Sequence, residues 1–485
     1  MDNRDLNKNN IYNSIATFVN ILFPLITFPY VTRVLGVDGL GKYNFSNAIV
    51  SYFSLIATLG ISSYAIRECA KLKNDRNGLN NLASEIFSID IYSTIIAYLM
   101  LFVALLLSTK LKNYTVYILI LSVSFIANTI GTMWICNAVD DFRYLSFKTI
   151  ILHIVSLVCL FLFVKNENDL YKYIIISVGT NLVANIHCIF YRKKYVEVKF
   201  ILFPNLKKHL KKIILLFSQC VSMLLYTNAD MVMLGYYYND ETVGFYAIAV
   251  KIYNIINSVI SSVITVATPG LSYDYSNKNY VAFNEKITYV VNYILFLFIP
   301  AFIGMNIMAP EIIKIVAGES FALSVASLRI LTVSMMFSLI SAIIGIGILF
   351  PMGHDKVNFY SCIISATSNI ILNFYFIPKY GIIGAAFTTA TAELLGILNK
   401  IKYIDKNIKV YGFIKSFFKY LLGGMLVALI CIILKKILPN KSIYSMIIMI
   451  LSAGSYFIYL IIIKDEFFKN FIKPVVKKIY KFIKI

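Results

Sequence analysis

Charged residues are scarce in this chain, and this scarcity limits the class of protein to which it can belong. Of its 485 residues, 14% are charged and 59% are hydrophobic. An ordinary soluble domain carries about 25% charged residues, so this chain has too little polar surface to form one. The composition indicates an integral membrane protein.

Residues that usually bind metals or form reactive clusters are also few. The sequence has four histidines and seven cysteines, and no two cysteines have C-x-x-C spacing. Cysteines scattered among apolar segments are expected to pack as small apolar side chains. His153 and His187 have no partner nearby in the sequence and are expected in the core. The sequence therefore predicts no metal site, no cofactor and no catalytic residue.

Long apolar windows fill most of the chain. A membrane-spanning helix needs about 20 mostly apolar residues, and the sequence contains fourteen such windows. They are residues 11–35, 43–66, 84–108, 114–138, 145–164, 172–191, 213–235, 244–270, 287–308, 323–350, 357–377, 381–399, 413–434 and 443–463. We expect an all-α polytopic membrane protein with about 14 transmembrane helices.

Lysine and arginine are distributed unevenly between the two sets of loops. With the N-terminus inside, 32 of the 45 Lys and Arg residues fall in cytoplasmic segments and 10 fall outside. Positive loops stay in the cytoplasm, so both termini are predicted to be cytoplasmic. The net charge of +21 is explained by basic loops that face an anionic lipid leaflet, so no nucleic-acid partner is expected.

A short motif occurs twice, and its copies divide the chain into two similar halves. Leu35-Gly36 is followed by Gly41-Lys42-Tyr43, and Leu234-Gly235 is followed by Gly244-Phe245-Tyr246. Duplicated halves are typical of secondary transporters. A basic loop separates the halves, which predicts one lobe at residues 1–200 (helices 1–6) and another at 201–408 (helices 7–12). Two extra helices and a basic cytoplasmic tail are predicted at 409–485.

The order of several motifs resembles that of the Wzx-type polysaccharide flippases, within the superfamily of multidrug, oligosaccharidyl-lipid and polysaccharide exporters. No single motif is decisive, and the resemblance covers helices 1 to 12. The matching segments are 28–36 (FPYVTRVLG), 41–43 (GKY), 60–71, 244–246 (GFY) with Lys251, 318–321 (GESF) leading to 328–331 (LRIL), and 378–386 (PKYGIIGAA).

This resemblance implies a transporter for cell-surface polysaccharide biosynthesis, of the O-antigen or capsule kind. It implies that undecaprenyl-diphosphate-linked oligosaccharide repeat units are flipped from the cytoplasmic to the outer leaflet by alternating access. The implied location is the bacterial cytoplasmic membrane. Membrane lipids and other polysaccharide assembly proteins are the implied partners, and we expect a monomer.

Three cationic side chains within or beside the predicted helices are candidates for binding the diphosphate. Arginine and lysine could replace its hydration through charge-assisted hydrogen bonds, and the candidates are Arg33, Lys251 and Arg329. Arg33 could equally extend to the membrane interface, and Lys251 could form an ion pair with Asp230. Arg329 has no acid near it in its own helix and is the first choice. Tyr30, one turn before Arg33, is the candidate for stacking on a sugar.

Acidic side chains at membrane depth are candidates for coupling transport to an ion gradient. Asp90 and Glu393 fit best because each lies in an otherwise apolar helix of a different half. Asp230 is a third candidate. Asp90 could instead pair with a lysine of a neighbouring loop, and Glu393 could simply be protonated. H⁺ coupling, Na⁺ coupling and substrate-driven flipping all remain open from the sequence.

Two other classes of membrane protein compete with the flippase. A cation-coupled multidrug antiporter of the same superfamily would favour an acidic cavity, but no Asp or Glu occurs between Asp5 and Asp38. A membrane polymerase or glycosyltransferase usually needs a sizeable external loop, and the predicted external loops here are short. The sequence therefore favours a transporter over an enzyme.

Overall fold

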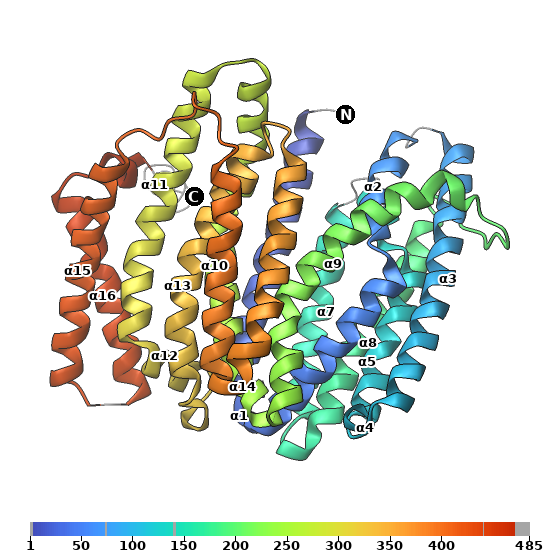
Figure 1. The fold of residues 1–485 in the computed structure, drawn as a ribbon, viewed down its shortest axis with the longest axis horizontal. Helices are drawn as coiled ribbons and strands as arrows, with labels where there is room; N and C mark the ends of the chain where they lie inside the picture. The colour runs from blue at the N-terminus through green and yellow to red at the C-terminus, as the bar shows by residue number, and fades with distance from the viewer. Residues whose placement is uncertain (1–2, 73–74, 139–141, 440, 471–485) are drawn as a thin grey trace, which may run out of the picture. The chain divides into compact units, whose positions relative to one another are not determined.

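The computed structural model describes residues 3–72, 75–138, 142–439 and 441–470, and these ranges contain helices and no β-strand (Figure 1). The longer helices are α1 (Asn3–Thr58), α3 (Arg76–Leu107), α5 (Thr115–Gly131), α7 (Phe142–Phe163), α8 (Leu170–Arg192), α9 (Leu206–Tyr237), α10 (Asp240–Ser276), α11 (Tyr280–Ile307), α13 (Ser324–Ala342), α14 (Asp355–Ile401), α15 (Phe413–Ile437) and α16 (Ser442–Ile462). The shorter ones are α2 (Ile61–Lys71), α4 (Thr109–Lys112), α6 (Met133–Ala138), α12 (Ala309–Val316), the 3₁₀ turns η1 (Glu167–Asp169) and η2 (Glu319–Phe321), and the π-helical turn η3 (Ile343–Leu349).

The lengths of these helices match a membrane protein. Eleven helices among the described residues are long and apolar enough to cross a membrane, and Thr115–Gly131 is a shorter apolar helix. The helical path of α1 is interrupted at Gly36 (φ 67°), and that of α14 at Gly381 (φ 55°). Glycine tolerates such positive φ values because it has no Cβ. α14 contains the predicted windows 357–377 and 381–399, and α1 contains the window 11–35 and most of 43–66. The all-α polytopic fold is confirmed, and the count of fourteen stays a prediction.

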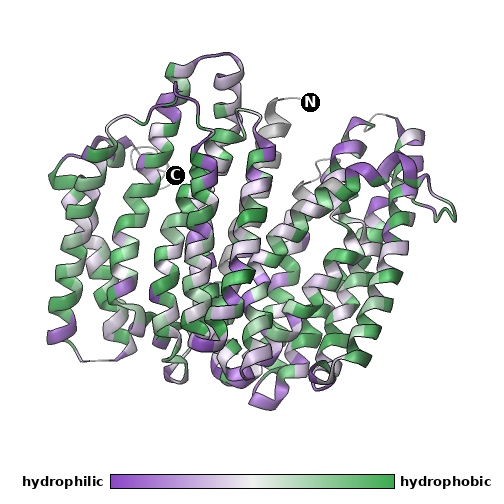
Figure 2. Cartoon of the chain, in the orientation of Figure 1, coloured by the Kyte–Doolittle hydropathy of each residue, from purple (hydrophilic) through white to green (hydrophobic). Residues whose placement is uncertain are grey.

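The faces of the helices suit contact with lipid. In Figure 2 hydrophobic residues predominate along the helices, and hydrophilic residues gather mainly at helix ends and in loops. Large apolar side chains such as Leu107, Val266 and Ile462 are exposed. Exposed apolar surface of this extent marks an interaction with membrane or protein, and here it agrees with a bilayer environment.

The chain divides into two compact units. Unit 1 comprises Met1–Ala247 and Asn373–Ile382, and unit 2 comprises Ile248–Leu372 and Ile383–Ile485. Each unit is described here by itself. The predicted lobe boundaries at residues 200 and 408 stay predictions.

In unit 1 the two copies of the repeated sequence motif pack against each other. A Cβ atom on Gly41 would lie 1.7 Å from the carbonyl oxygen of Asp240, and one on Gly244 would lie 2.3 Å from the carbonyl oxygen of Val37. Contacts that close exclude any side chain larger than hydrogen. The second glycine of each motif is therefore required by this approach of the two backbones.

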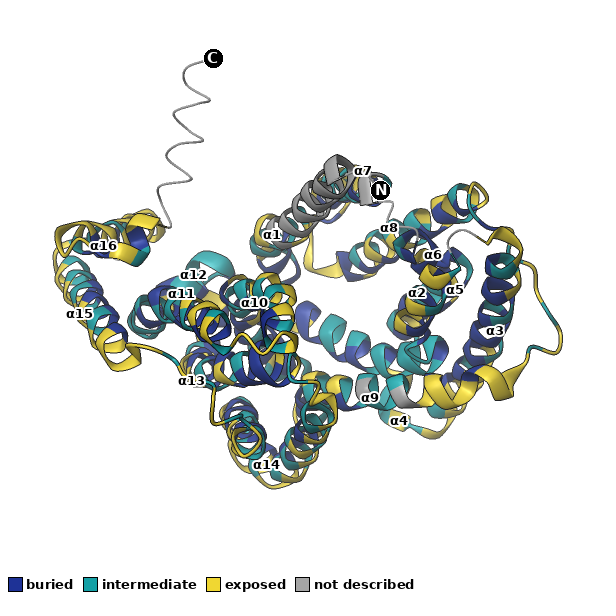
Figure 3. Cartoon of the chain, turned by 90° about the horizontal axis from the view of Figure 1, so that it is seen from above, coloured by how far each residue is buried: buried dark blue, intermediate teal, exposed yellow. Residues whose placement is uncertain are grey.

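In unit 2, α11 packs with α15 and α16 through aromatic side chains. The buried ring of Phe296 lies against those of Tyr420 and Tyr456, and the Tyr456 hydroxyl donates to the carbonyl of Phe296 at 2.8 Å. Exposed residues alternate with buried ones along α15 and α16 in Figure 3. An ion pair of 2.7 Å between Lys435 and Glu311 joins α15 to α12. These contacts fasten the two C-terminal helices to the rest of unit 2.

Candidate functional site

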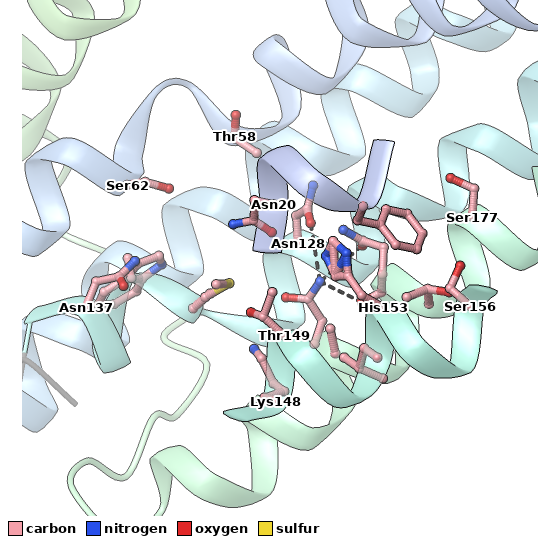
Figure 4. A pocket seen from close by; sticks show the side chains of 18 of the residues that line it. Asn20, Thr58, Ser62, Asn128, Asn137, Lys148, Thr149, His153, Ser156 and Ser177 are labelled. Carbon is pink, nitrogen blue, oxygen red and sulfur yellow. Dashed lines mark hydrogen bonds between the residues drawn. The ribbon is translucent and has the colours of Figure 1, made fainter. Parts of the chain in front are cut away.

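A polar cavity of about 680 Å³ lies inside unit 1 and is the candidate functional site. Helices α1, α2, α3, α5, α6, α7 and α8 contribute to its lining (Figure 4). Most lining side chains carry an amide or a hydroxyl group: Asn20, Thr27, Thr58, Ser62, Asn128, Asn137, Thr149, Ser156, Tyr173, Ser177, Thr180, Asn181 and Asn185. A cavity of this size and chemistry suits a hydrophilic ligand, since small-molecule sites occupy about 300 to 1,000 Å³.

An asparagine cluster forms one wall where α5 meets α8. The Asn185 Nδ2 group donates to Asn181 Oδ1 at 3.1 Å, and a longer contact of 3.4 Å joins it to Asn128 Oδ1. A Cβ on Gly131 would lie 2.0 Å from Asn185 Oδ1. Gly131 thus gives the Asn185 amide room to lie between the two helices, beside the cavity.

Two charged side chains of opposite sign line the cavity. Asp90 on α3 is only 4% exposed, and Lys148 on α7 is 8% exposed. The hydroxyls of Ser93 and Thr94 donate to the backbone carbonyl of Asp90 and not to its carboxylate. Lys148 Nζ lies 3.1 Å from the sulfur of Cys188. The cavity can therefore offer a carboxylate and an ammonium group to one ligand.

Three buried polar atoms on the lining residues make no hydrogen bond with the part of the chain that the structure describes. They are Asp90 Oδ1, Trp134 Nε1 and His153 Nδ1. A buried polar group without a partner is costly. The indole of Trp134 can only donate and the carboxylate of Asp90 can accept, so together they suit a ligand that carries several hydroxyl groups.

Of the predicted site residues, Asp90 lines this cavity, and Tyr30 and Arg33 on α1 do not. The Tyr30 hydroxyl donates to the carbonyl of Val164 at 2.7 Å, which fastens α1 to the end of α7. Arg33 is exposed, and its Nη1 donates to the carbonyl of Pro29 on its own helix at 2.7 Å. Sugar stacking by Tyr30 and anion binding by Arg33 stay predictions.

Asp230 lies buried elsewhere in unit 1, on α9. It accepts hydrogen bonds of 2.6 Å from the hydroxyl of Tyr246 and from the side-chain amide of Asn373. These two partners come from α10 and α14, so one carboxylate links three helices. Ion coupling through Asp230 stays a prediction.

The other three predicted residues belong to unit 2. Arg329 on α13 is exposed, and its Nε donates to the carbonyl of Asn306, in the last turn of α11, at 3.1 Å. Lys251 on α10 and Glu393 on α14 are half-buried. Anion binding by Lys251 and Arg329 and ion coupling by Glu393 stay predictions. Among the described residues, no group of three or more His, Cys, Asp and Glu could hold a metal ion.

Several cavity residues were not predicted from the sequence, although a signal was present. Along α8 a polar side chain recurs every fourth residue, at Tyr173, Ser177, Asn181 and Asn185. This spacing places them on one face of that helix. His153, expected in the core, lines the cavity with its ring 4.2 Å from that of Phe23. Polar residues at helical spacing inside apolar windows would have pointed to this lining.

Comparison with solved structures identifies the fold. The lipid II flippase MurJ, in an inward closed conformation, matches with a TM-score of 0.75 and 20% identity, covering 96% of this chain and 100% of that one. An inward-facing multidrug resistance MATE family transporter matches with a TM-score of 0.59 and 13% identity, covering 81% of this chain and 97% of that one. At these identities the likeness shows the fold alone.

Comparison with known sequences identifies the family. The protein named "Putative O-antigen transporter" of Escherichia coli (strain K12) is 22% identical over 408 residues, which are 83% of this chain and 97% of that protein. The "Capsular polysaccharide biosynthesis protein CapF" of Staphylococcus aureus is 24% identical over 416 residues, 81% of this chain and 97% of that protein. These findings confirm the resemblance seen in the sequence and the expectation of a transporter instead of an enzyme. The family model described as "Polysaccharide biosynthesis protein" matches residues 6–273, more than half of the chain, and the chain therefore belongs to this family.

Proposed function

We propose that the protein flips an undecaprenyl-diphosphate-linked oligosaccharide repeat unit from the cytoplasmic to the outer leaflet of the bacterial cytoplasmic membrane. The relatives' names, with O-antigen and capsular polysaccharide in them, support a role in surface polysaccharide synthesis. The observation that carries the proposal is the amide- and hydroxyl-lined cavity within a helical membrane protein. A lipid-linked sugar needs such a polar enclosure because its headgroup loses water on leaving the aqueous phase.

The saccharide part of the substrate is the group that this cavity would hold. Asparagine amides can donate to and accept from sugar hydroxyls at the same time, and the Trp134 and His153 rings add apolar faces to the lining. The lipid tail would stay in the bilayer. Alternating access would then expose the cavity first to the cytoplasm and later to the outside.

The diphosphate and the driving ion would use charged groups. Lys148 is added here to the cationic candidates Arg33, Lys251 and Arg329 because it lines the cavity. Asp90 is the foremost of the acidic candidates for H⁺ or Na⁺ coupling. It is buried, it lies in the cavity wall, and one of its carboxylate oxygens accepts no hydrogen bond from the described residues. Asp230 and Glu393 are retained as alternatives.

Flipping of a labelled lipid-linked oligosaccharide in liposomes tests the proposal. The purified protein is reconstituted, and the label is measured by its accessibility to an external reagent, with and without H⁺ or Na⁺ gradients. We expect protein-dependent movement that is faster with one gradient. Absence of movement, together with transport of an organic cation, would replace the flippase with a multidrug antiporter.

Single substitutions in the cavity wall show whether the cavity holds the saccharide. Asn181→Ala removes a lining amide and should slow flipping. Asn399→Ala is a matched control because Asn399 is a half-buried residue in unit 2 that donates to Ser361. Equal slowing by both variants, at equal abundance in the membrane, would argue against the cavity as the substrate site.

A further inference from the structure

The loop that joins α8 to α9 is docked along α3, and we call its residues 196–202 the strap. Three of its backbone N–H groups donate to side chains of α3: Glu197 to Asn80 Oδ1 at 2.9 Å, Lys199 to Ser84 Oγ at 3.0 Å, and Ile201 to Ser88 Oγ at 2.7 Å. At its end, the Tyr92 hydroxyl donates to the carbonyl of Leu202 at 2.6 Å. The strap is thus held at four successive points.

The spacing of these hydrogen bonds follows from the geometry of helix and strand. Acceptors four residues apart on a helix are separated by about 6.0 Å, and every second N–H of an extended chain by about 6.6 Å. Ser84 and Ser88 donate their own protons to carbonyls of the preceding turn of α3, at 2.7 and 2.8 Å. Their oxygen lone pairs therefore remain available to the strap.

Two of the remaining strap residues, Val196 and Val198, face the protein interior, whereas Phe200 and Leu202 are exposed. Val196 is fully buried in a cluster with Leu82 and Ile86 of α3, and Val198 packs against the same cluster. Ser88 is 0% exposed. Release of the strap would break its three hydrogen bonds to α3 side chains and expose the apolar surface of Val196, so docking is favoured.

Unit 2 contains a second strap of the same design. Lys409 N donates to Asn284 Oδ1 and Tyr411 N donates to Thr288 Oγ1, both at 3.0 Å, along α11. Ile408 and Val410 pack against the apolar cluster around Ile287. The pattern Asn-x-x-x-Ser at 80–84 thus corresponds to Asn-x-x-x-Thr at 284–288, and the duplication extends to the loops that leave each half.

The first turn of α9, which follows the strap, is held on the same helices. His209 is 0% exposed, and its Nε2 lies 2.6 Å from Glu85 Oε2 on α3. Its Nδ1 lies 2.6 Å from the Tyr64 hydroxyl on α2. An Nε2–H that donates to the carboxylate leaves Nδ1 to accept from the tyrosine. Strap and histidine together tie the start of the second half to α2 and α3.

We propose that the strap is a permanent anchor and that Asn80, Ser84 and Ser88 are positioning residues for the movement between the halves. Ile213 of α9 belongs to the same buried cluster as Val196. The strap stays docked on α3 through the whole transport cycle, so the chain flexes beyond Ile213 and not in the loop. Only the effect of these three residues on transport depends on the proposed function. Docking itself is measured without any transport assay.

Amide hydrogen exchange, resolved to single residues in the reconstituted protein, tests the docking. Lys199 and Ile201 should exchange about tenfold or more slowly than Val198 and Phe200, whose amides make no hydrogen bond in the described part of the chain. The same contrast should persist when substrate and gradient are added. Equal exchange at all four amides, or loss of the contrast during turnover, would overturn the anchor.

A reversible cross-link tests whether the strap must release. The rings of Tyr92 and Phe200 lie 5.8 Å apart, so Tyr92→Cys with Phe200→Cys can be bridged by a short bifunctional thiosulfonate, in a background without the seven native cysteines. We expect the bridged protein to retain transport within about twofold of the unbridged protein and of each single-cysteine variant treated alike. Loss of transport on bridging, restored by reduction, would show that the strap moves and would refute the proposal.

Two substitutions at Asn80 separate anchoring from mere structural support. Asn80→Ala removes the acceptor for Glu197, so it should speed exchange at that amide and slow transport. Asn80→Asp keeps an acceptor oxygen, so the exchange rate at the Glu197 amide and the transport rate should both return to those of the unsubstituted protein. Slowed transport in Asn80→Ala with exchange unchanged at Glu197 would contradict a role through the strap.

Discussion

Substitution of Gly41 by alanine should separate the two packed copies of the sequence motif. The new Cβ would lie 1.7 Å from the Asp240 carbonyl oxygen and 2.4 Å from its carbon, whereas ordinary contact begins at 3.4 Å. The opposing atoms are backbone and cannot rotate away, so the two packed copies of the motif must move apart by about the missing distance. Overpacking of this kind costs about 1–3 kcal/mol, which corresponds to a shift of about 5- to 150-fold between two conformations.

Cysteine labelling measures this separation. Val37→Cys places a thiol beside Gly244, where a Cβ would lie 3.1 Å from Val37 Cγ1, in a background without native cysteines. A membrane-impermeant thiol reagent should label it faster when Gly41→Ala is added. Gly179→Ala is the matched control, because a Cβ there would meet no atom of the described residues within 4 Å. Equal labelling rates with the two alanine substitutions would refute the packing argument.

Three other substitutions probe the site and are read in the liposome assay. Asp90→Asn should abolish stimulation by the ion gradient while protein abundance stays unchanged, since the amide cannot carry the charge, and persisting stimulation would remove Asp90 from coupling. Gly131→Ala should displace the Asn185 amide, where the Cβ would lie 2.0 Å from Oδ1, lowering both the unfolding temperature and the flipping rate relative to Gly179→Ala. An unchanged rate would show that this amide is not needed. Arg329→Gln should lower transport at normal abundance, and a wild-type rate would remove Arg329 from the substrate site.

Part of the site was predictable from local sequence. Asp90 was selected because a carboxylate in an apolar helix is costly, and the structure places it in the cavity wall. Arg33 is a candidate as a cation at membrane depth and Tyr30 as an aromatic ring one turn before it. Yet Arg33 donates a hydrogen bond to the backbone carbonyl of Pro29, and Tyr30 donates one to that of Val164. Depth along one helix does not say which way a side chain faces across a bundle.

The sequence by itself determined the membrane class, the helical windows and the duplication. Apolar composition and helix length are local properties, since a bilayer requires about 20 apolar residues and internally bonded backbone. The two glycine motifs could likewise be read directly from their spacing.

The tertiary structure alone decided which polar residues meet. The cluster of Asn128, Asn181 and Asn185 joins two helices that are separated along the chain, and the strap matches every second residue of a loop to every fourth residue of α3. Such contacts depend on the rotation and register of packed helices. Packing between helices sets the rotation and the register of each helix, and the residue pattern within one segment predicts neither.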